Sequence, residues 1–304
     1  MLQNVLHALQ QKIAFHEKAL QKYRLIKAPY WQAPASCPSV QETFITTMAQ
    51  WNSCPFVPAQ HYDTAHLQAV WAQLHAGDAL PWPSDPALQE AWCLFHNGQF
   101  QQAAEAGLEL GAAGQVVTNK ATSVYATYLE TGEKERFDLY WQVARRAGAQ
   151  AQAEPDNANA WYWQAHALGR YSQSISVAKA LAQGIGQKVK TALERTIALA
   201  PRHAEARTVL GAFHAEVIDK VGPLIGNMAY GAKKDVGLQM FEEALRINPR
   251  SILARVEYAR ALVMLEGDKR MAQATSLYQQ AAQSNPLDAA EQLDVALART
   301  ELQD

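Results

Sequence analysis

The spacing of apolar residues changes along the chain and predicts several distinct elements. Between Leu2 and Leu25, apolar residues recur at helical spacing among Gln, His and Lys, which predicts an amphipathic helix and not a signal peptide. Residues 27–62 contain five prolines and only two charged residues, a composition typical of an irregular, packed cover. A short helix is expected from Asp63 to about His75, with Asp63 as its N-cap.

From residue 84 onward the sequence repeats. The turns predicted at Asn97-Gly98-Gln99-Phe100 and Thr131-Gly132-Glu133-Lys134 lie 34 residues apart. Three later segments begin with a large residue, at Leu193, Phe241 and Tyr278, followed by a small residue three positions on and a proline eight positions on. The large residue fills the gap between helix pairs, the small one lets two backbones approach, and the proline ends the helix.

These motifs resemble the tetratricopeptide repeat (TPR) family, whose repeat has this length. The first-helix signature of that family matches Trp161, six residues after Pro155, and also Leu210-Gly211 and Tyr258-Ala259, nine and ten residues after Pro201 and Pro249. The last repeat matches the second-helix positions at Ala274, Tyr278, Ala281 and Pro286. The resemblance implies an all-α fold, a right-handed α-solenoid of helix hairpins with an N-terminal extension and a C-terminal capping helix.

The chain is therefore predicted to contain a helical, proline-rich cover, five TPR-like units and a capping helix. The predicted ranges are 1–80 for the cover, 84–117, 118–157, 158–203, 204–251 and 252–286 for the units, and 287–304 for the cap, with Asp288 as its N-cap. The third unit is enlarged by residues 171–190, which predict lengthened helices. The fourth is enlarged by residues 217–235, which predict a packed apolar hairpin or, alternatively, a lid over a hydrophobic cavity.

The two enlarged units carry a narrower resemblance. Over residues 150–286 the arrangement is similar to the C-terminal region of the regulator of microtubule dynamics proteins. It is more loosely similar to the periplasmic T component of TRAP-type transport. That component is an exported lipoprotein, and this chain shows no lipidation signal.

Composition and charge narrow the possible functions. The formal net charge is -2, from 27 basic and 29 acidic residues, so the chain lacks the basic footprint of a nucleic-acid-binding protein. The 3 cysteines are an odd number without a CxxC pair, which favours a reducing compartment. No apolar stretch reaches the length of about 18 residues that a membrane span needs. A cytoplasmic location is expected.

The sequence contains no recognisable catalytic or cofactor motif. A Walker loop, a nucleophile elbow and a GxGxxG motif are all absent, and Gly222-Pro-Leu-Ile-Gly226 lacks the Lys-Ser/Thr of a phosphate-binding loop. His16-Glu17 begins like a zincin helix, but Leu20 stands where the second His belongs. His66 and His75 lie on different helix faces, so surface or cap roles are favoured over metal binding. We expect neither an enzyme nor a cofactor.

The TPR resemblance implies a binding surface in the concave groove formed by the first helix of each unit. The implied groove residues are Trp92, His96, Asn119, Thr122, Asn159, Tyr162, His166, Arg170, Glu205, Thr208, Arg260 and Met264. Polar side chains along one groove suit the backbone of an extended peptide, although each could equally be a solvated or internally hydrogen-bonded group. A carboxylate clamp is not supported, because Leu88 and Trp92 occupy the first-unit clamp positions.

Two functions follow as hypotheses. The first is a non-catalytic interaction scaffold that binds a protein or peptide segment in the groove. The alternative is a carrier of a small apolar ligand held between the enlarged third and fourth units. The sequence leaves the oligomeric state open, and it leaves open whether residues 27–62 occupy the groove.

Overall fold

The computed structural model describes residues 50–303, which are helical and contain no strand. The predicted helix between Leu2 and Leu25 and most of the predicted cover lie outside the described residues. The helices are α2 (Thr64–Leu74), α3 (Pro86–His96), α4 (Phe100–Glu109), α5 (Gln115–Tyr128), α6 (Glu133–Ala153), α7 (Ala158–Ser172), α8 (Val177–Ala182), α9 (Ile185–Leu199), α10 (Ala204–Val221), α11 (Pro223–Tyr230), α12 (Lys234–Ile247), α13 (Ile252–Glu266), the 3-10 helix η1 (Gly267–Arg270), α14 (Met271–Ala282) and α15 (Ala289–Glu301).

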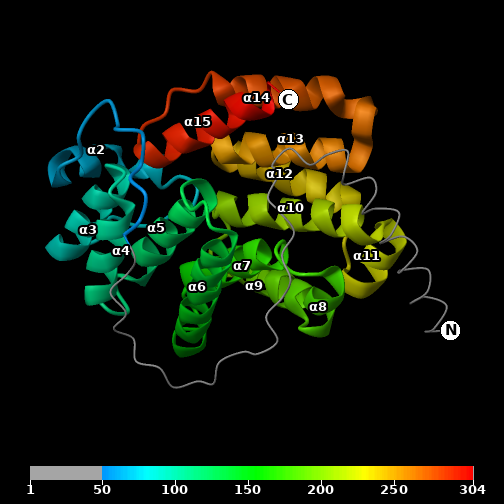
Figure 1. The fold of residues 1–304 in the computed structure, drawn as a ribbon, viewed down its shortest axis with the longest axis horizontal. Helices are drawn as coiled ribbons and strands as arrows, with labels where there is room; N and C mark the ends of the chain where they lie inside the picture. The colour runs from blue at the N-terminus through cyan, green and yellow to red at the C-terminus, as the bar shows by residue number, and fades with distance from the viewer. Residues whose placement is uncertain (1–49, 304) are drawn as a thin grey trace. The chain divides into compact units, whose positions relative to one another are not determined.

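The helices pack in chain order as antiparallel pairs, which makes residues 52–303 an all-α solenoid in one compact unit (Figure 1). The first helices of the pairs, α3, α5, α7, α10 and α13, contact one another in sequence, and α13 also contacts α15. We call these six helices the inner helices. Their partners α4, α6, α9, α12 and α14 pack mainly against the inner helices and not against one another. The predicted fold class is thereby confirmed, whereas the exact unit boundaries stay a prediction.

Small residues allow paired helices to approach closely. A Cβ added to Gly211 of α10 would lie 2.7 Å from the ring of Phe241 and 3.0 Å from the carbonyl oxygen of Gly237, both on α12. A Cβ added to Gly237 would lie 2.9 Å from that of His214. Larger residues at these two glycines would force α10 and α12 apart, because neither the ring nor the backbone can yield that much in a close-packed core.

The apolar core consists of layers between successive helix pairs. One cluster joins α10, α12, α13, α14 and α15, and another joins α6, α7, α9 and α10. The ring of Phe241 is fully buried and stacks on Tyr258 with a centroid distance of 5.1 Å. The alanines predicted to occupy small packing positions, Ala244, Ala274 and Ala281, are buried as expected.

Both enlarged segments differ from their predicted form. Residues 171–190 contain a separate short helix, α8, in place of lengthened helices, because Gly184 adopts the left-handed conformation (φ 62°) and interrupts the helix before α9. Residues 217–235 contain a short helix, α11, which Pro223 starts and Gly231 (φ 64°) ends and which packs back on the end of α10. Leu224 and Met228 of α11 are 73% and 80% exposed, so this segment is less packed than predicted.

Two predicted helix starts are confirmed. The carboxylate of Asp63 accepts a hydrogen bond from the backbone N–H of His66 and caps α2, and Asp288 caps α15 through the N–H of Glu291. No helix among residues 50–303 is long and apolar enough to cross a membrane.

Candidate functional site

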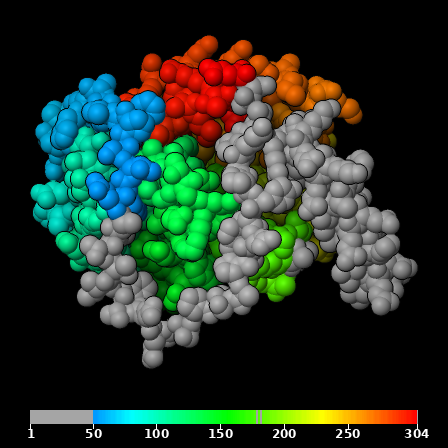
Figure 2. Space-filling view, viewed as in Figure 1, coloured from blue at the N-terminus to red at the C-terminus, as the bar shows by residue number. Residues whose placement is uncertain are grey.

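The two ends of the described chain meet and close the inner helices around a buried polar interior. The hydroxyl of Tyr62 donates a hydrogen bond of 2.7 Å to the carbonyl oxygen of Leu287, and the amide of Gln292 donates one of 3.1 Å to the carbonyl of Val57. The segment before α2 therefore lies against the start of α15 (Figure 1), and their surfaces meet in Figure 2. We use the term closing contact for the contacts that join residues 57–62, the ends of α2 and α3, and the start of α15.

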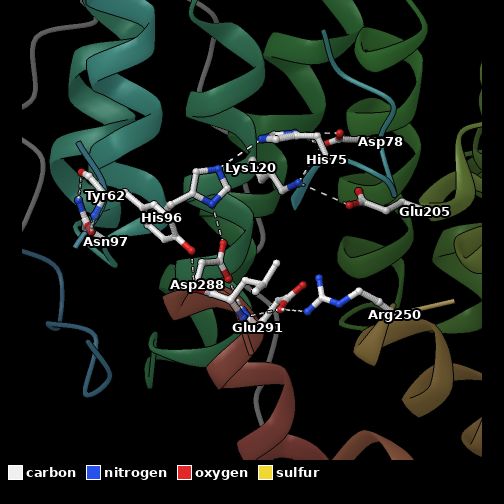
Figure 3. A network of polar contacts seen from close by, with 11 residues as sticks. Tyr62, His75, Asp78, His96, Asn97, Lys120, Glu205, Arg250, Asp288 and Glu291 are labelled. Atoms are coloured by element: carbon white, nitrogen blue, oxygen red, sulfur yellow. Dashed lines mark hydrogen bonds and ion pairs between the residues drawn. The ribbon is translucent and has the colours of Figure 1, made fainter. Parts of the chain in front are cut away.

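Two His–Asp pairs form the centre of the closing contact (Figure 3). The Nδ1 atom of His75 lies 2.9 Å from Asp78, and the Nδ1 atom of His96 lies 2.6 Å from Asp288, which is 192 residues later in the chain. The Nε2 atoms of the two imidazoles lie 3.3 Å apart. Both rings therefore use both nitrogens within the protein, which leaves neither free to act as a general base toward a substrate.

Burial sets the protonation of these groups. It lowers the pKa of His96 to about 4, and the hydrogen bond with Asp288 opposes this only in part. Burial by itself would raise the pKa of Asp288, but its hydrogen bonds with His96 and with the backbone N–H of Glu291 hold it below its usual value. Burial likewise opposes ionisation of Asp78, yet His75 and Lys120 hold its pKa well below the ordinary range. The interior therefore carries charged carboxylates.

Lys120 of α5 supplies the matching positive charge. Its Nζ atom lies 2.8 Å from Asp78 and 3.5 Å from Glu205 of α10 (Figure 3). Burial would lower the pKa of Lys120, but the charges of Asp78 and then Glu205 raise it above its usual value. One ammonium group thus ties the loop after α2 to two of the inner helices.

A second series of ion pairs crosses the inner helices. The guanidinium of Arg170 on α7 lies 3.0 Å from the carboxylate of Glu257 on α13. Arg260 lies 3.4 Å from the same carboxylate and 2.7 Å from Glu301 of α15. The hydroxyl of Tyr128 on α5 hydrogen-bonds to the carboxyl of Asp294 on α15. These contacts extend the polar interior along the length of α15.

Two cavities adjoin this interior. The first, of about 190 Å³, lies between α7, α9, α10 and α11. Its wall is largely apolar, from Ile175, Val177, Val189, Phe213, Val217, Val221 and Tyr230. Its charged groups are paired with one another: Arg170 with Glu257, and Lys220 with Glu216 at 3.6 Å. The cavity lies between the two enlarged helix pairs and is bounded by α11.

The second cavity, of about 140 Å³, lies among the inner helices and is more polar. It is lined by charged groups of the interior, including Lys120, Asp288 and Asp294. The two cavities share one wall, formed by His166, Arg170, Thr208, Val209 and Leu253. Within the part of the chain that the structure describes, no group of His, Cys, Asp or Glu is placed to hold a metal ion.

The predicted groove residues divide into two groups. Six of them are buried: Trp92, His96, Asn119, Thr122, Tyr162 and Thr208. The others are at least partly exposed: Asn159, His166, Arg170, Glu205, Arg260 and Met264. The sequence left open whether the groove is free, and in the structure the packing of the inner helices covers the first group. Trp92, Asn119 and Thr122 line neither cavity, so a partner could reach them only if the helices that cover them moved.

The second cavity brings six predicted residues together, and it leaves the others aside. Those at the cavity are His96, Tyr162, His166, Arg170, Glu205 and Thr208. On α5 the cavity is lined by Lys120 and Ser123, whereas Asn119 and Thr122 were predicted, because neighbouring helix positions point about 100° apart. On α13 it is lined by Ile252 near the helix start, well before the predicted positions 260 and 264.

Sequence reasoning missed several groups that build the site. Asp288 was recognised only as a helix cap, and Lys120, Glu257 and Asp294 were not singled out. Each belongs to a contact between residues far apart in the chain, so no local spacing marks it. The one available signal was that Lys120 is flanked by two predicted groove positions.

The comparisons with known proteins bear on the fold. A crystal structure of a TPR protein from Thermus thermophilus superposes with a TM-score of 0.50 at 14% identity, covering 70% of this chain and 97% of that one. No protein-family model and no curated protein sequence matches the chain. The likeness establishes a TPR-like fold. It lends no support to the narrower resemblance to regulators of microtubule dynamics or to the transport T component.

Proposed function

We propose that the chain is a non-catalytic interaction scaffold that binds a protein segment, with an apolar anchor of the segment in the first cavity. The observation that carries the proposal is the position of this mostly apolar cavity, against the inner helices α7, α10 and α13 of a TPR-like array. TPR-like folds serve in general as interaction scaffolds. Both ring nitrogens of His75 and of His96 contact other protein groups, which argues against acid–base catalysis by these histidines.

The wall of the first cavity suits an amphipathic segment. An apolar side chain would displace water from the surfaces of Phe213, Val217 and Tyr230, which is the main source of affinity at such anchors. The Arg170–Glu257 pair at the same wall offers a donor and an acceptor to the backbone of the segment. Of the predicted groove residues, His166, Arg170 and Thr208 line this cavity and would contact the partner here.

Gly169 permits a test that leaves the packing intact. It lines the first cavity from α7, and a Cβ added there would meet no atom within 4 Å. Gly169→Leu should therefore fill the cavity without separating any helices. We expect a partner captured from lysate by the wild-type chain and by Gly169→Ala to be lost with Gly169→Leu. Equal capture by all three proteins, at equal helicity and melting temperature, would contradict the anchor site.

A second candidate function is favoured by the same cavity. Its mostly apolar wall lies between the enlarged helix pairs, where a small apolar ligand was predicted to be carried. Native mass spectrometry of gently purified wild-type protein should then show a bound small molecule, and Gly169→Leu should show none. An empty wild-type chain that still captures a protein would rule out the carrier and keep the scaffold.

A further inference from the structure

The second cavity has a charge pattern that neither proposed function uses. Four carboxyl groups line it, from Glu205, Asp288, Glu291 and Asp294, and they face only two cationic side chains. The excess of carboxyl groups makes the cavity a poor host for an anion. It is suited in sign to a cation.

Asp294 stands apart from the other three carboxyl groups. Glu205 lies 3.5 Å from Lys120, Glu291 lies 3.5 Å from Arg250, and Asp288 hydrogen-bonds with His96. Among residues 50–303, Asp294 has a hydrogen bond from the Tyr128 hydroxyl but no ion pair. A buried carboxylate is costly without a positive partner, so this position would gain most from a bound cation.

The other walls of the cavity are aromatic and hold unpaired polar atoms. Phe95, Tyr128, Tyr162 and Trp163 all line it, and the faces of such rings attract organic cations. Ser123 and Trp163 are 1% and 4% exposed and also line it, yet the hydroxyl of Ser123 and the indole N–H of Trp163 have no hydrogen-bond partner. Such buried polar atoms can complete their hydrogen bonds only with a further group inside the cavity.

We propose that the second cavity binds a small organic cation. Its ligand contains an ammonium group and, close to it, a neutral hydrogen-bond acceptor. The ammonium lies against the Asp294 carboxylate and the aromatic rings. The acceptor takes the indole N–H of Trp163, and the Ser123 hydroxyl hydrogen-bonds to either part. A free amino alcohol has this chemistry, and so does a lysine side chain together with a nearby carbonyl of its backbone.

The protonation of Asp294 gives the proposal a distinctive signature. Burial raises the pKa of Asp294 to about 8, with smaller contributions from Glu291, Asp288 and Glu205, whereas the Tyr128 hydrogen bond lowers it. The free site therefore holds a proton on Asp294 at pH 7. A bound cation stabilises the carboxylate, so binding at pH 7 should release close to one proton.

Isothermal titration calorimetry on the full chain tests the proposal. The probes are choline, ethanolamine and a lysine capped at both backbone ends, each against sodium chloride at equal ionic strength. We expect saturable binding of at least one organic probe, with an enthalpy that changes between phosphate and MOPS buffer by the amount that corresponds to proton release. Binding of choline or ethanolamine identifies a free amine as the ligand type, and binding of capped lysine alone identifies a partner's side chain.

Asp294→Asn is the matched variant, because an amide replaces a protonated carboxyl with little change of shape. It should weaken binding by about tenfold or more and abolish the buffer dependence. Asp138→Asn removes a carboxylate from an exposed ion pair on α6, and it should change neither the affinity for the probe nor the buffer dependence of the enthalpy. The uncharged carbon analogue of choline should not bind. The proposal is overturned if no organic probe binds, if sodium chloride gives the same heat, or if Asp294→Asn binds as the wild type does.

Discussion

The interfaces between successive helix pairs and the closing contact hold the same array together by different chemistry. The interface of α10 and α12 joins neighbouring segments through the ring of Phe241 and the close backbone approach at two glycines, beside the 3.1 Å ion pair of Arg207 and Glu243. The closing contact joins segments 192 residues apart through His96 and Asp288, with Lys120 close by. Apolar interfaces supply most of the folding free energy, whereas buried polar contacts gain little net energy and specify which groups must meet.

The difference separates contacts that could be repeated from contacts that are specific to one place. Each helix pair can bury its apolar face on the next pair, so the repeat could continue with further pairs. At the closing contact the last helix lies against the segment before α2. The polar groups of this interface form all their hydrogen bonds only when α15 lies in one position along the inner helices, because each donor needs its own acceptor.

The largest expected effect is at an interface between pairs. Phe241→Ala should lower the free energy of unfolding by about 3–5 kcal/mol, because it removes a fully buried ring and leaves a cavity. Leu224→Ala, at a residue that is 73% exposed on α11, should change it by less than about 0.5 kcal/mol. Urea denaturation followed by circular dichroism measures both values. Similar losses in the two variants would show that burial does not govern the apolar interfaces.

The closing contact should respond less strongly. Asp288→Ala removes the 2.6 Å contact with His96 and the cap of α15, for an expected loss of about 2–4 kcal/mol. Asp85→Ala removes only the cap of α3, for about 1 kcal/mol. The difference between the two losses isolates the buried contact. An equal loss in both variants would mean that the His96–Asp288 contact adds nothing to stability.

Acid should weaken the polar interior before it affects the apolar interfaces. The pKa of His96 is lowered to about 4 and that of His166 to about 3, in both cases chiefly by burial. Unfolded histidines bind protons below about pH 6.5 and these folded ones do not. Stability is therefore present above pH 6.5 and is lost as the pH falls, by about 1.4 kcal/mol per pH unit for each histidine.

Urea midpoints measured between pH 7 and pH 5 test this dependence. His166→Gln should reduce the slope, because one of the two groups no longer takes up a proton on unfolding. Asp294, whose pKa is raised to about 8, opposes this dependence with the slope of one group, so the wild-type slope reports the histidines less Asp294. Equal slopes in His166→Gln and the wild type would contradict burial of a neutral His166 imidazole.

The smallest expected effect is a gain. Gly169→Ala places a methyl group where no atom lies within 4 Å and restricts the unfolded chain, which should raise stability by about 0.5–1 kcal/mol. Thermal unfolding of the variant beside the wild type measures the increase. A decrease would indicate that the wall of the first cavity does not tolerate even a methyl group.

The sequence could predict the features that depend on local spacing. The helix pairs, the N-caps Asp63 and Asp288 and the buried small residues such as Ala244 follow from neighbours at most a few turns away. A repeat pattern also favours the correct fold class, because each pair must bury its apolar face on the next one. The same local logic failed at Gly184, where a backbone conformation and not hydrophobicity ended a helix.

The site itself could be predicted only in part. Family positions on α7 named Tyr162, His166 and Arg170, and all three line the second cavity, whereas their role in binding a partner stays a prediction. They could not show that α15 would cover His96, because that depends on the curvature summed over all the helix pairs. The pairing of Asp294 with Tyr128 has the same origin and left no trace in the spacing of residues.

The separation of His96 from Asp288 also has a consequence during synthesis. At roughly 5–20 residues per second, a ribosome needs about 10–40 s to add the 192 residues between them. During that interval the first helix pairs can fold on one another, while Lys120 and His96 still face water. The array thus passes through a form in which these groups are hydrated, and they are buried once α15 has been added.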